Sequence, residues 1–390
     1  MRQFICIFSA FALLIGCVKI DPTTTTGQES EAVIAFESPI VAAKVKSVAE
    51  FKSYPDDRNF RVWGYYSESN AQHILSNSLT MYMNGAEFSK QGDTWASVGK
   101  NYYWPKNGYL DFVAYAPAKL QVALTETKPT FKTISEQDYV QFGKYTVPDK
   151  ADEDLLISDV AYGCTKPEVE DAGAPLMFHH VLSSVVFKVN SSIYGDRDNV
   201  DPNRVDTDLR VTKIEILKVR ARGILNVNMR TNKKSCTTFE EENTLKKNFT
   251  GYNSDPDKGT GAGTVLTDEF QFCHDMQIAP EKEGTHSLTN LILLPQRLLD
   301  DVVLRVTYDM TTSTMSEANG TNEEVWIKDQ VKTIKMNECG VTEWKVGTRY
   351  CYNISLGLNK IQCSAEVSDW ITTEITTDVE DLSVRDVIGL

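Results

Sequence analysis

Adjacent histidines, His179 and His180, are the most conspicuous candidate metal ligands in this sequence. They lie within the apolar run LMFHHVLSSVVFKV, which is typical of a β-strand. Neighbouring residues of a strand point to opposite faces, so the two imidazoles cannot bind one ion from that strand. We therefore expect structural histidines and no metal site.

The stretch DPDKGTGAGTVLTDE at 255–269 combines acids and glycines, which could bind phosphate or calcium. It lacks the Lys-Ser/Thr pair of a phosphate-binding loop and the spacing of a calcium loop. The sequence also contains neither G-x-S-x-G nor H-E-x-x-H. We therefore expect no catalytic residues, no cofactor and no enzymatic activity.

Cysteine is the remaining reactive residue type, with 8 copies in the chain. Apart from Cys6 and Cys17 near the N-terminus, the cysteines are scattered singly, which argues against a zinc site. Cys351 and Cys363 lie on candidate neighbouring strands and could meet as a disulfide. The alternative, that these cysteines are small buried apolar residues, stays open.

The N-terminus, MRQFICIFSAFALLIGC, reads as a secretory signal over residues 1–16. It carries an early Arg2, and its apolar stretch from Phe4 to Ile15 is too short to span a bilayer. The stretch ends in Leu-Ile-Gly-Cys17, which resembles the lipobox of bacterial lipoproteins. That resemblance implies cleavage before Cys17, acylation (palmitate) of its thiol and anchoring in the outer membrane through lipid. An ordinary signal peptide is the alternative.

Bulk composition limits the partners and the class of protein. The net charge of −14 argues against nucleic acid as a partner, and 41% hydrophobic residues suffice for packed cores. A length of 390 residues suggests two domains.

The elements that must position these residues are strands. Runs rich in Val, Ile, Thr and Tyr alternate with turn residues; in one of them Leu110, Phe112 and Ala114 share a face opposite Val113 and Tyr115. We expect an all-β chain of two tandem antiparallel β-sandwiches, at 33–170 and 171–370. A polar tether occupies 17–32, and a linker runs from Pro39 to about Arg58. The best helix candidates are the short runs EFKSY and TFEEENTLKKNF.

The last residues, 371–390, form an apolar tail beyond the presumed final strand. Their spacing fits two short strand segments joined by a bend. It also fits a helix over the first part of the tail, and a disordered tail is a third alternative. The aliphatic positions are Ile371, Ile375, Val379, Leu382, Val384 and Ile388.

Five runs in order, together with the lipobox, resemble the fimbrillin family, the FimA/Mfa-like type V pilin lipoproteins of anaerobic Gram-negative bacteria. The runs are YYWPKNGYLDFVAYAP, DLLISDVAYG, PLMFHHVLSSVVFKV, LILLPQ and VGTRYCYNISLGLNKIQCSAEVSDW. The resemblance implies transthyretin-like β-sandwich domains in a structural subunit of a cell-surface pilus, or fimbria, that supports adhesion. It also implies that a surface protease, arginine-specific in some members, removes the first strand. A neighbouring subunit then donates a strand to the vacated groove.

On this hypothesis the removable strand is 33–38, and the tail 371–390 is the donor strand. Arg58, in the turn-like YPDDRNF, is the preferred cleavage site, with Lys46 and Lys44 as further candidates, whereas Arg61 lies inside a presumed strand. The partners are other pilin subunits and an unidentified surface ligand. The alternative is a glycan-binding lipoprotein of the outer membrane that stacks sugars on Tyr65, Tyr66, Tyr102, Tyr103 and Trp104.

Overall fold

The computed structural model describes most of the chain between residues 32 and 370. The described residues are 32–44, 49–69, 80–123, 130–134, 137–149, 151, 153–167, 173–191, 206–228, 245–254, 264–265, 270–272, 286–288, 290–315, 322–356 and 361–370. Within these ranges the regular structure is β-strand with short 3₁₀ turns such as η1 (Ala118–Ala123) and η3 (Met336–Glu338). The all-β prediction is confirmed. In the same ranges no helix has the length and apolar character needed to cross a bilayer.

The N-terminal half forms one 10-stranded sheet, in the order β1-β6-β5-β4-β7-β10-β12-β2-β3, with β11 paired to β7. Its strands are β1 (Ala35–Phe36), β2 (Ile40–Lys44), β3 (Ala49–Ser53), β4 (Phe60–Ser67), β5 (Thr80–Gln91), β6 (Thr94–Ser97), β7 (Tyr109–Ala116), β10 (Leu156–Ser158), β11 (Ala161–Cys164) and β12 (Met177–His180). Two of these strands were not expected. The interval from Pro39 to Arg58 contains β2 and β3, and the helix candidate EFKSY is largely strand β3.

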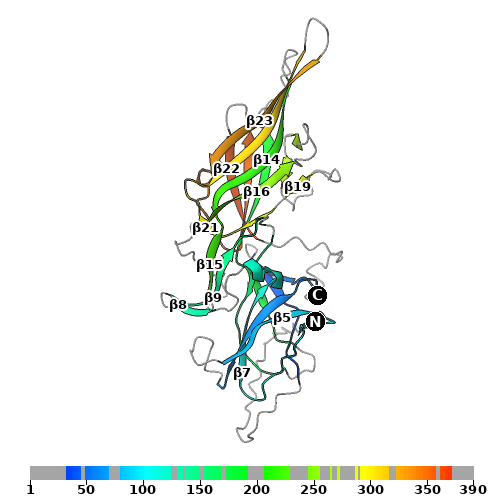
Figure 1. Cartoon of the computed structure of the whole chain (residues 1–390), viewed down its shortest axis with the longest axis vertical. Helices are drawn as coiled ribbons and strands as arrows, with labels where there is room; N and C mark the ends of the chain where they lie inside the picture. The colour runs from blue at the N-terminus through cyan, green and yellow to red at the C-terminus, as the bar shows by residue number, and fades with distance from the viewer. Residues whose placement is uncertain are drawn as a thin grey trace, which may run out of the picture.

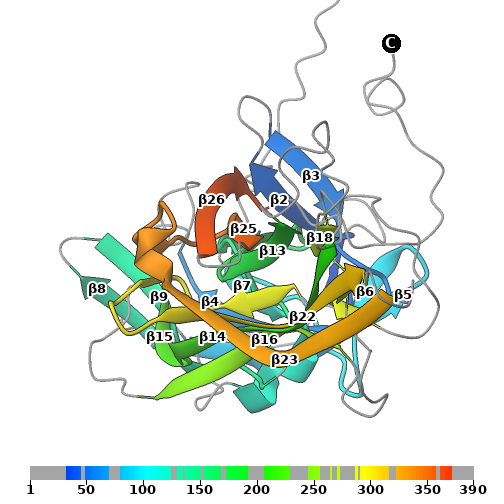
Figure 2. The same ribbon diagram turned by 90° about the horizontal axis from the view of Figure 1, so that it is seen from above.

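The C-terminal half packs two sheets face to face. One has the order β18-β13-β25-β26 with β20 paired to β13, and the other β19-β16-β14-β22-β23 with β17 paired to β14. Viewed along the long axis, β13, β25 and β26 form one layer and β14, β16, β22 and β23 the other (Figure 2). The strands are β13 (Ser183–Ser191), β14 (Asp206–Arg220), β16 (Lys246–Ser254), β17 (Thr264–Val265), β18 (Phe270–Phe272), β19 (His286–Leu288), β20 (Leu291–Leu293), β22 (Val303–Met315), β23 (Asn322–Lys335), β25 (Thr348–Leu356) and β26 (Ile361–Asp369).

A three-stranded sheet joins the two halves of this elongated molecule, and a two-stranded sheet lies within the C-terminal half (Figure 1). β15 (Arg222–Asn228) pairs with β9 (Gln137–Thr146), which pairs with β8 (Thr130–Ile134); β21 (Gln296–Arg297) pairs with β24 (Glu343–Trp344). Most ladders are antiparallel, but β13 pairs with β25, and β12 with β2, in parallel. β12 belongs to the N-terminal sheet although it follows residue 171. The domain limits at 170 and 171 stay a prediction.

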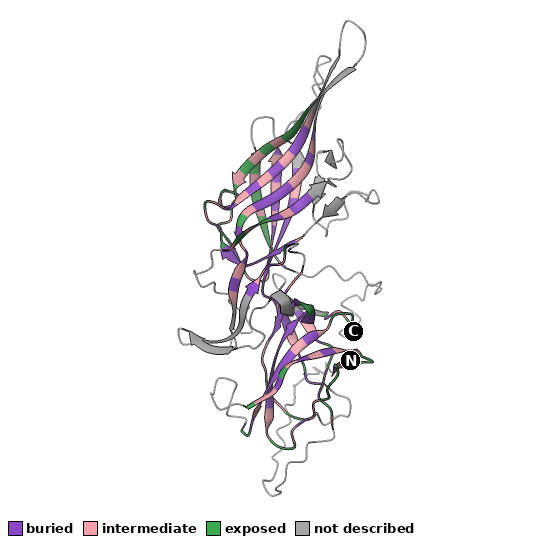
Figure 3. Ribbon diagram, viewed as in Figure 1, coloured by how far each residue is buried: buried purple, intermediate pink, exposed green. Residues whose placement is uncertain are grey.

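Two apolar clusters account for the strand patterns. Along β7, Leu110, Phe112 and Ala114 are buried in a cluster internal to the N-terminal half, whereas Val113 and Tyr115 belong to a second cluster that continues into the C-terminal half. The alternation expected from the sequence is therefore correct, and both faces of β7 are buried. Buried positions gather on β14 and β22 and exposed ones on β23, at the sheet edge (Figure 3).

One charged cluster lies across the middle of the larger C-terminal sheet. Glu215 on β14 is 6% exposed, and its carboxylate accepts hydrogen bonds from Arg305 Nε on β22 at 2.9 Å and pairs with Lys213 Nζ at 2.8 Å. Burial raises the pKa of Glu215, but the hydrogen bonds from Lys213 and Arg305 outweigh it. The net pKa therefore lies below the ordinary value of 4.5.

Replacing Glu215 by Gln should destabilise the protein by about 1–2 kcal/mol at pH 7, because the partly exposed Arg305 and Lys213 lose a charged acceptor. Since the folded-state pKa is depressed, this stabilisation is present above the unfolded pKa and is lost as pH falls through the folded pKa. Urea unfolding of wild type and E215Q should therefore differ at pH 7 and converge at a pH below the folded-state pKa of Glu215, which itself lies under 4.5. The control Glu366→Gln, on the exposed face of β26, should change little. An equal E215Q deficit at both pH values would contradict this account.

Candidate functional site

The candidate site is the groove filled by the N-terminal segment 32–44, hereafter the N-terminal segment. On one side the segment follows β6: Ala35 pairs with Ala96 and Phe36 with Trp95. Towards its start the segment pairs with residues 102–104, where Ile34 N–H donates to Tyr102 O at 2.7 Å. On this side the segment is therefore hydrogen-bonded to β6 and to the chain before β7.

On its other side the same segment is hydrogen-bonded to the chain that leads into β12. Ala174 N–H donates to Ala35 O at 2.9 Å, and Glu37 N–H donates to Ala174 O at 3.1 Å. Three residues later β2 begins, and Ile40 pairs with Met177 in a parallel ladder. Because β1 pairs with β6 at one end of the sheet order and β2 pairs with β12 next to the other end, where only β3 lies beyond it, the segment covers both margins of one curled sheet.

Gly173 permits this close approach. A Cβ at residue 173 would lie 2.2 Å from Glu37 N and 2.3 Å from Phe36 C, a distance that backbone atoms cannot accommodate without moving. The sequence patterns did not single out this glycine. The only local signal was a glycine between small residues, which is equally common in loops.

Apolar side chains fix the segment in the N-terminal core. Ile34 and Phe36 are fully buried, and Phe36 packs edge-to-face on Phe88 at 4.8 Å and on Phe112 at 5.1 Å between ring centroids. Val41 is 5% exposed. Each such side chain contributes roughly 1.5–3 kcal/mol on burial, so removing the segment would expose a groove lined by aromatic rings.

Tyr54, which follows β3, also belongs to this core. It is 2% exposed, its ring lies 5.4 Å from Phe178, and its N–H donates to Pro39 O at 2.7 Å. Burial raises the pKa of its hydroxyl well above the ordinary value. The segment, β3 and Tyr54 thus fill one side of the N-terminal core.

The candidate cleavage residues differ in accessibility. Arg58 is exposed in a turn whose Arg58 N–H donates to Pro55 O at 3.3 Å, directly before β4. Arg61 lies within β4, where its guanidinium donates to Glu87 at 2.9 Å and to Gly85 O at 3.1 Å. Lys44 ends β2, and Lys46 lies outside the described residues. Among these, the turn at Arg58 is the segment best shaped for a protease.

At the other end of the described chain, Trp370 lies at the junction of the two halves. Its ring stacks on His180 of β12 at 4.4 Å, and its N–H donates to Gly347 O at 3.3 Å. Cys17 and the tail residues proposed as donor strand lie outside the described residues; the latter are Ile371, Ile375, Val379, Leu382, Val384 and Ile388.

The two histidines contact different carboxylates. His179 Nε2 lies 2.9 Å from Asp159 Oδ2, whereas His180 Nδ1 contacts Asp154. Among the residues that the structure describes, no group of three His, Cys, Asp or Glu side chains is arranged to hold a metal ion. Both histidines lie on β12 of the N-terminal sheet, and the two carboxylates flank its ladder partner β10.

The suggested contact between Cys351 and Cys363 is wrong. The ladder of β25 and β26 pairs Cys351 with Glu366 and Cys363 with Ile354. Because Ile354 faces the core and Cys351 lies three positions earlier, the two cysteines point to opposite faces of the sheet. Strand register, which the sequence did not specify, decides this.

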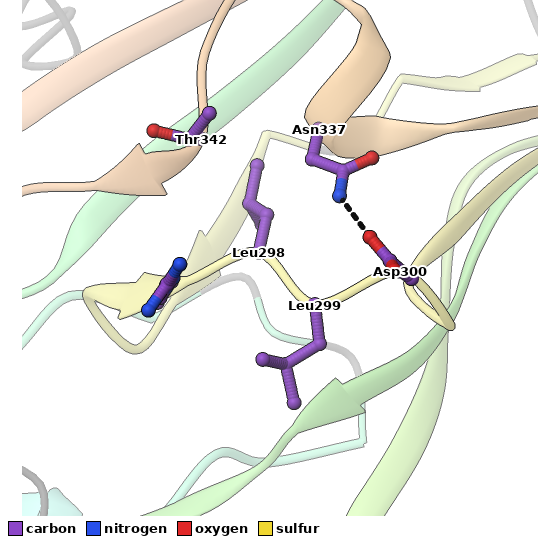
Figure 4. Close-up of a pocket in the computed structure, with 6 residues that line it drawn as sticks. Leu298, Leu299, Asp300, Asn337 and Thr342 are labelled. Atoms are coloured by element: carbon purple, nitrogen blue, oxygen red, sulfur yellow. Dashed lines mark hydrogen bonds between the residues drawn. The ribbon is translucent and has the colours of Figure 1, made fainter.

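Two other features could have carried chemistry. A hollow of about 360 Å³ lies beside η3, and its Asp300 accepts a 2.7 Å hydrogen bond from Asn337 Nδ2 (Figure 4). Asp300 is the one carboxylate among the residues that line the hollow, so the hollow offers no carboxylate pair for acid–base catalysis. Of the aromatics considered for sugar stacking, Tyr65 is 6% and Trp104 1% exposed, so both are core residues.

Comparison with known proteins identifies the chain's relatives. The model of a family described as fimbrillin-like matches residues 55–370. A solved fimbrial protein from Bacteroides vulgatus ATCC 8482 is 15% identical, with a TM-score of 0.51 over 87% of this chain and 99% of that chain. A candidate cell adhesion protein from Bacteroides ovatus ATCC 8483 is 14% identical, with a TM-score of 0.43 over 88% and 99% of the two chains. No curated protein matches the chain.

Replacing Gly173 by Ala should loosen the N-terminal segment without removing any of its own side chains. Hydrogen–deuterium exchange of peptides covering 32–44 should accelerate at least about tenfold, equivalent to about 1.4 kcal/mol, because the new methyl group clashes with the segment backbone. The control Gly340→Ala places a methyl group at a strained φ in the C-terminal half, away from the segment, and should leave that exchange unchanged. Unaltered protection in G173A would show that the contact does not hold the segment.

Proposed function

This chain belongs to the fimbrillin-like family, and from that premise we propose that it is a structural subunit of a cell-surface pilus that polymerises by strand exchange. The observation that carries the proposal is the N-terminal segment, which pairs with both edges of the N-terminal sheet and buries Ile34 and Phe36. In this proposal the segment is a placeholder for a strand from a neighbouring subunit.

Cleavage after Arg58 is the proposed trigger. It separates β1, β2, β3 and Tyr54 from the rest of the sheet, leaving Asn59 as the new N-terminus. The four buried side chains Ile34, Phe36, Val41 and Tyr54 together contribute on the order of 10 kcal/mol, so the segment stays docked until a cut is made and can then be lost. The vacated groove has unpaired backbone groups on both edges and an apolar floor.

The tail 371–390 is the proposed replacement. Its alternating residues Ile371, Ile375 and Val379 can face a core while the intervening threonines and acids face solvent. β-strand addition would restore the main-chain hydrogen bonds that cleavage exposes. A self-docked strand or helix is the competing arrangement of the tail.

Export and location complete the proposal. The lipobox supports delivery to the outer membrane as a lipoprotein acylated at Cys17, and trimming then releases the subunit from its lipid into a surface pilus. The pilus is proposed to support adhesion. The subunit keeps both a removable segment and a donor tail, which supports a stalk or accessory position.

The proposed cut can be tested by treating the full-length protein with a trace of an arginine-specific protease. We expect an early product whose N-terminus is Asn59, because Arg58 is exposed in a turn and Arg61 is paired within β4. R58Q should abolish that product, and R61Q, the matched control, should not. Early cleavage of R58Q at an equal rate would refute Arg58 as the site.

The donor role of the tail is tested by electron microscopy of trimmed protein. Ile375→Asp should abolish filaments, because a charge would enter the apolar groove at a cost of several kcal/mol. Thr376→Asp, one residue along and on the opposite face, should leave filaments intact. Filaments of wild-type length from I375D, or from a chain lacking 371–390, would end the strand-exchange proposal.

A further inference from the structure

A pair of cysteines distant in the sequence meets in the C-terminal core. Cys339 directly follows η3, in the connection between β23 and β24, and is fully buried. Cys363 is the third residue of β26, where it packs half-buried against the same core cluster. Both are thiols in this structure.

The two side chains lie near each other in the same part of the core. Cys339 and Tyr352 belong to one apolar cluster, and Cys363 packs against that cluster. The neighbouring backbones agree with this placement, since a Cβ at Gly340 would lie 3.9 Å from Ala365 N on β26 and Ala365 is paired with Tyr352. The proximity is also felt electrostatically, because Cys339 raises the pKa of Cys363. Cys339 Sγ–H itself donates to Lys335 O at 3.6 Å.

We propose that Cys339 and Cys363 form a disulfide in the exported protein. The inference rests on the proposed surface location, because oxidising compartments permit structural disulfides. The thiolate of one cysteine attacks the disulfide of a donor, either a thiol–disulfide oxidoreductase or a small-molecule disulfide. The second thiolate then displaces the donor from the mixed disulfide. The two cysteines lose two protons and two electrons, and the donor disulfide is reduced to two thiols.

The Cys363 thiol is a poor nucleophile in the folded protein. The interaction with Cys339, together with burial, raises the pKa of Cys363 far above its ordinary value. Since the thiolate is the attacking species, attack by Cys363 on a donor disulfide is disfavoured once β26 has docked.

The position of the bond gives it a mechanical role. β26 is an edge strand, because among the described residues its ladder partner is β25. It ends at Asp369, two residues before the proposed donor tail 371–390 begins. Pulling on the tail would separate the ladder from Asp369 backwards. A covalent link from Cys363 to the turn after β23 stops this separation within the strand and ties β26 to the opposite sheet.

The other described cysteines do not offer this geometry. Cys351 faces away from Cys363 across the sheet, as the register shows. Cys164 lies in the N-terminal half, where its thiol donates to Ala161 O at 3.6 Å. Burial raises the pKa of Cys164 to about 12.

The test is thiol mapping of the full-length protein, produced with its own signal and exported by a Gram-negative host. Free thiols are blocked with iodoacetamide during unfolding, without reductant, and the protease digest is analysed by mass spectrometry. We expect one cross-linked peptide joining Cys339 and Cys363, which disappears on reduction and is absent from C363S. Alkylation of both residues, or linkage of either to a different cysteine, overturns the proposal. The measurement needs no filaments, so its outcome is independent of strand exchange.

A thermal measurement distinguishes a structural disulfide from an incidental one. Dithiothreitol should lower the Tm of the wild type by about 5 °C or more, because the bond closes a loop of more than twenty residues. The C339A/C363A double variant should show no such shift, and C351S should respond to dithiothreitol as wild type does. An equal shift in the double variant would assign the effect to another bond and overturn the proposal.

Discussion

The constraint on which this structure depends is that the edges of a β-sheet must not be left open. The N-terminal sheet begins with β1 and ends with β2 and β3, yet only residues 37–39 separate β1 from β2 along the chain. One short segment therefore covers both edges, and its side chains reach the core between them. Displacing it exposes two ladders and an apolar groove together, so a single backbone cut has a large structural effect.

The floor of that groove explains why it cannot stay empty. Phe36 packs against Phe60, Phe88 and Phe112, and the four rings form one cluster with Trp95 close by. Without Phe36 these rings would form a contiguous apolar surface of the kind that drives association. The tail 371–390 has no aromatic residue, so an incoming strand would have to fill the site with Ile, Val or Leu. In the proposed exchange, the binding free energy of the incoming strand must come from several aliphatic contacts and a continuous ladder of main-chain hydrogen bonds. It cannot come from an aromatic ring that replaces Phe36.

Sequence patterns predicted those features that depend on local alternation. The strand at 110–116 was recognised because apolar residues fill both parities, and the structure buries both faces of β7. The patterns could not show that Pro39–Arg58 contains β2 and β3, because the partner of Ile40 is Met177, more than a hundred residues away. The role of Gly173 and the meeting of Cys339 with Cys363 were missed for the same reason. Pairing between distant strands leaves no mark on the sequence around either residue.

The last described residue shows how the two halves would share a load in the proposed filament. Trp370 N–H donates to Gly347 O, and Gly347 N–H donates to Leu182 O at 2.8 Å, between β12 and β13. The Trp370 ring also stacks on His180, which is held by Asp154 of the N-terminal half. Tension applied at the start of the tail therefore enters both halves at their junction. The force then acts along the parallel ladder of β13 and β25, where nine residue pairs resist it together. The ladder of β26 alone would instead open one pair after another from its end.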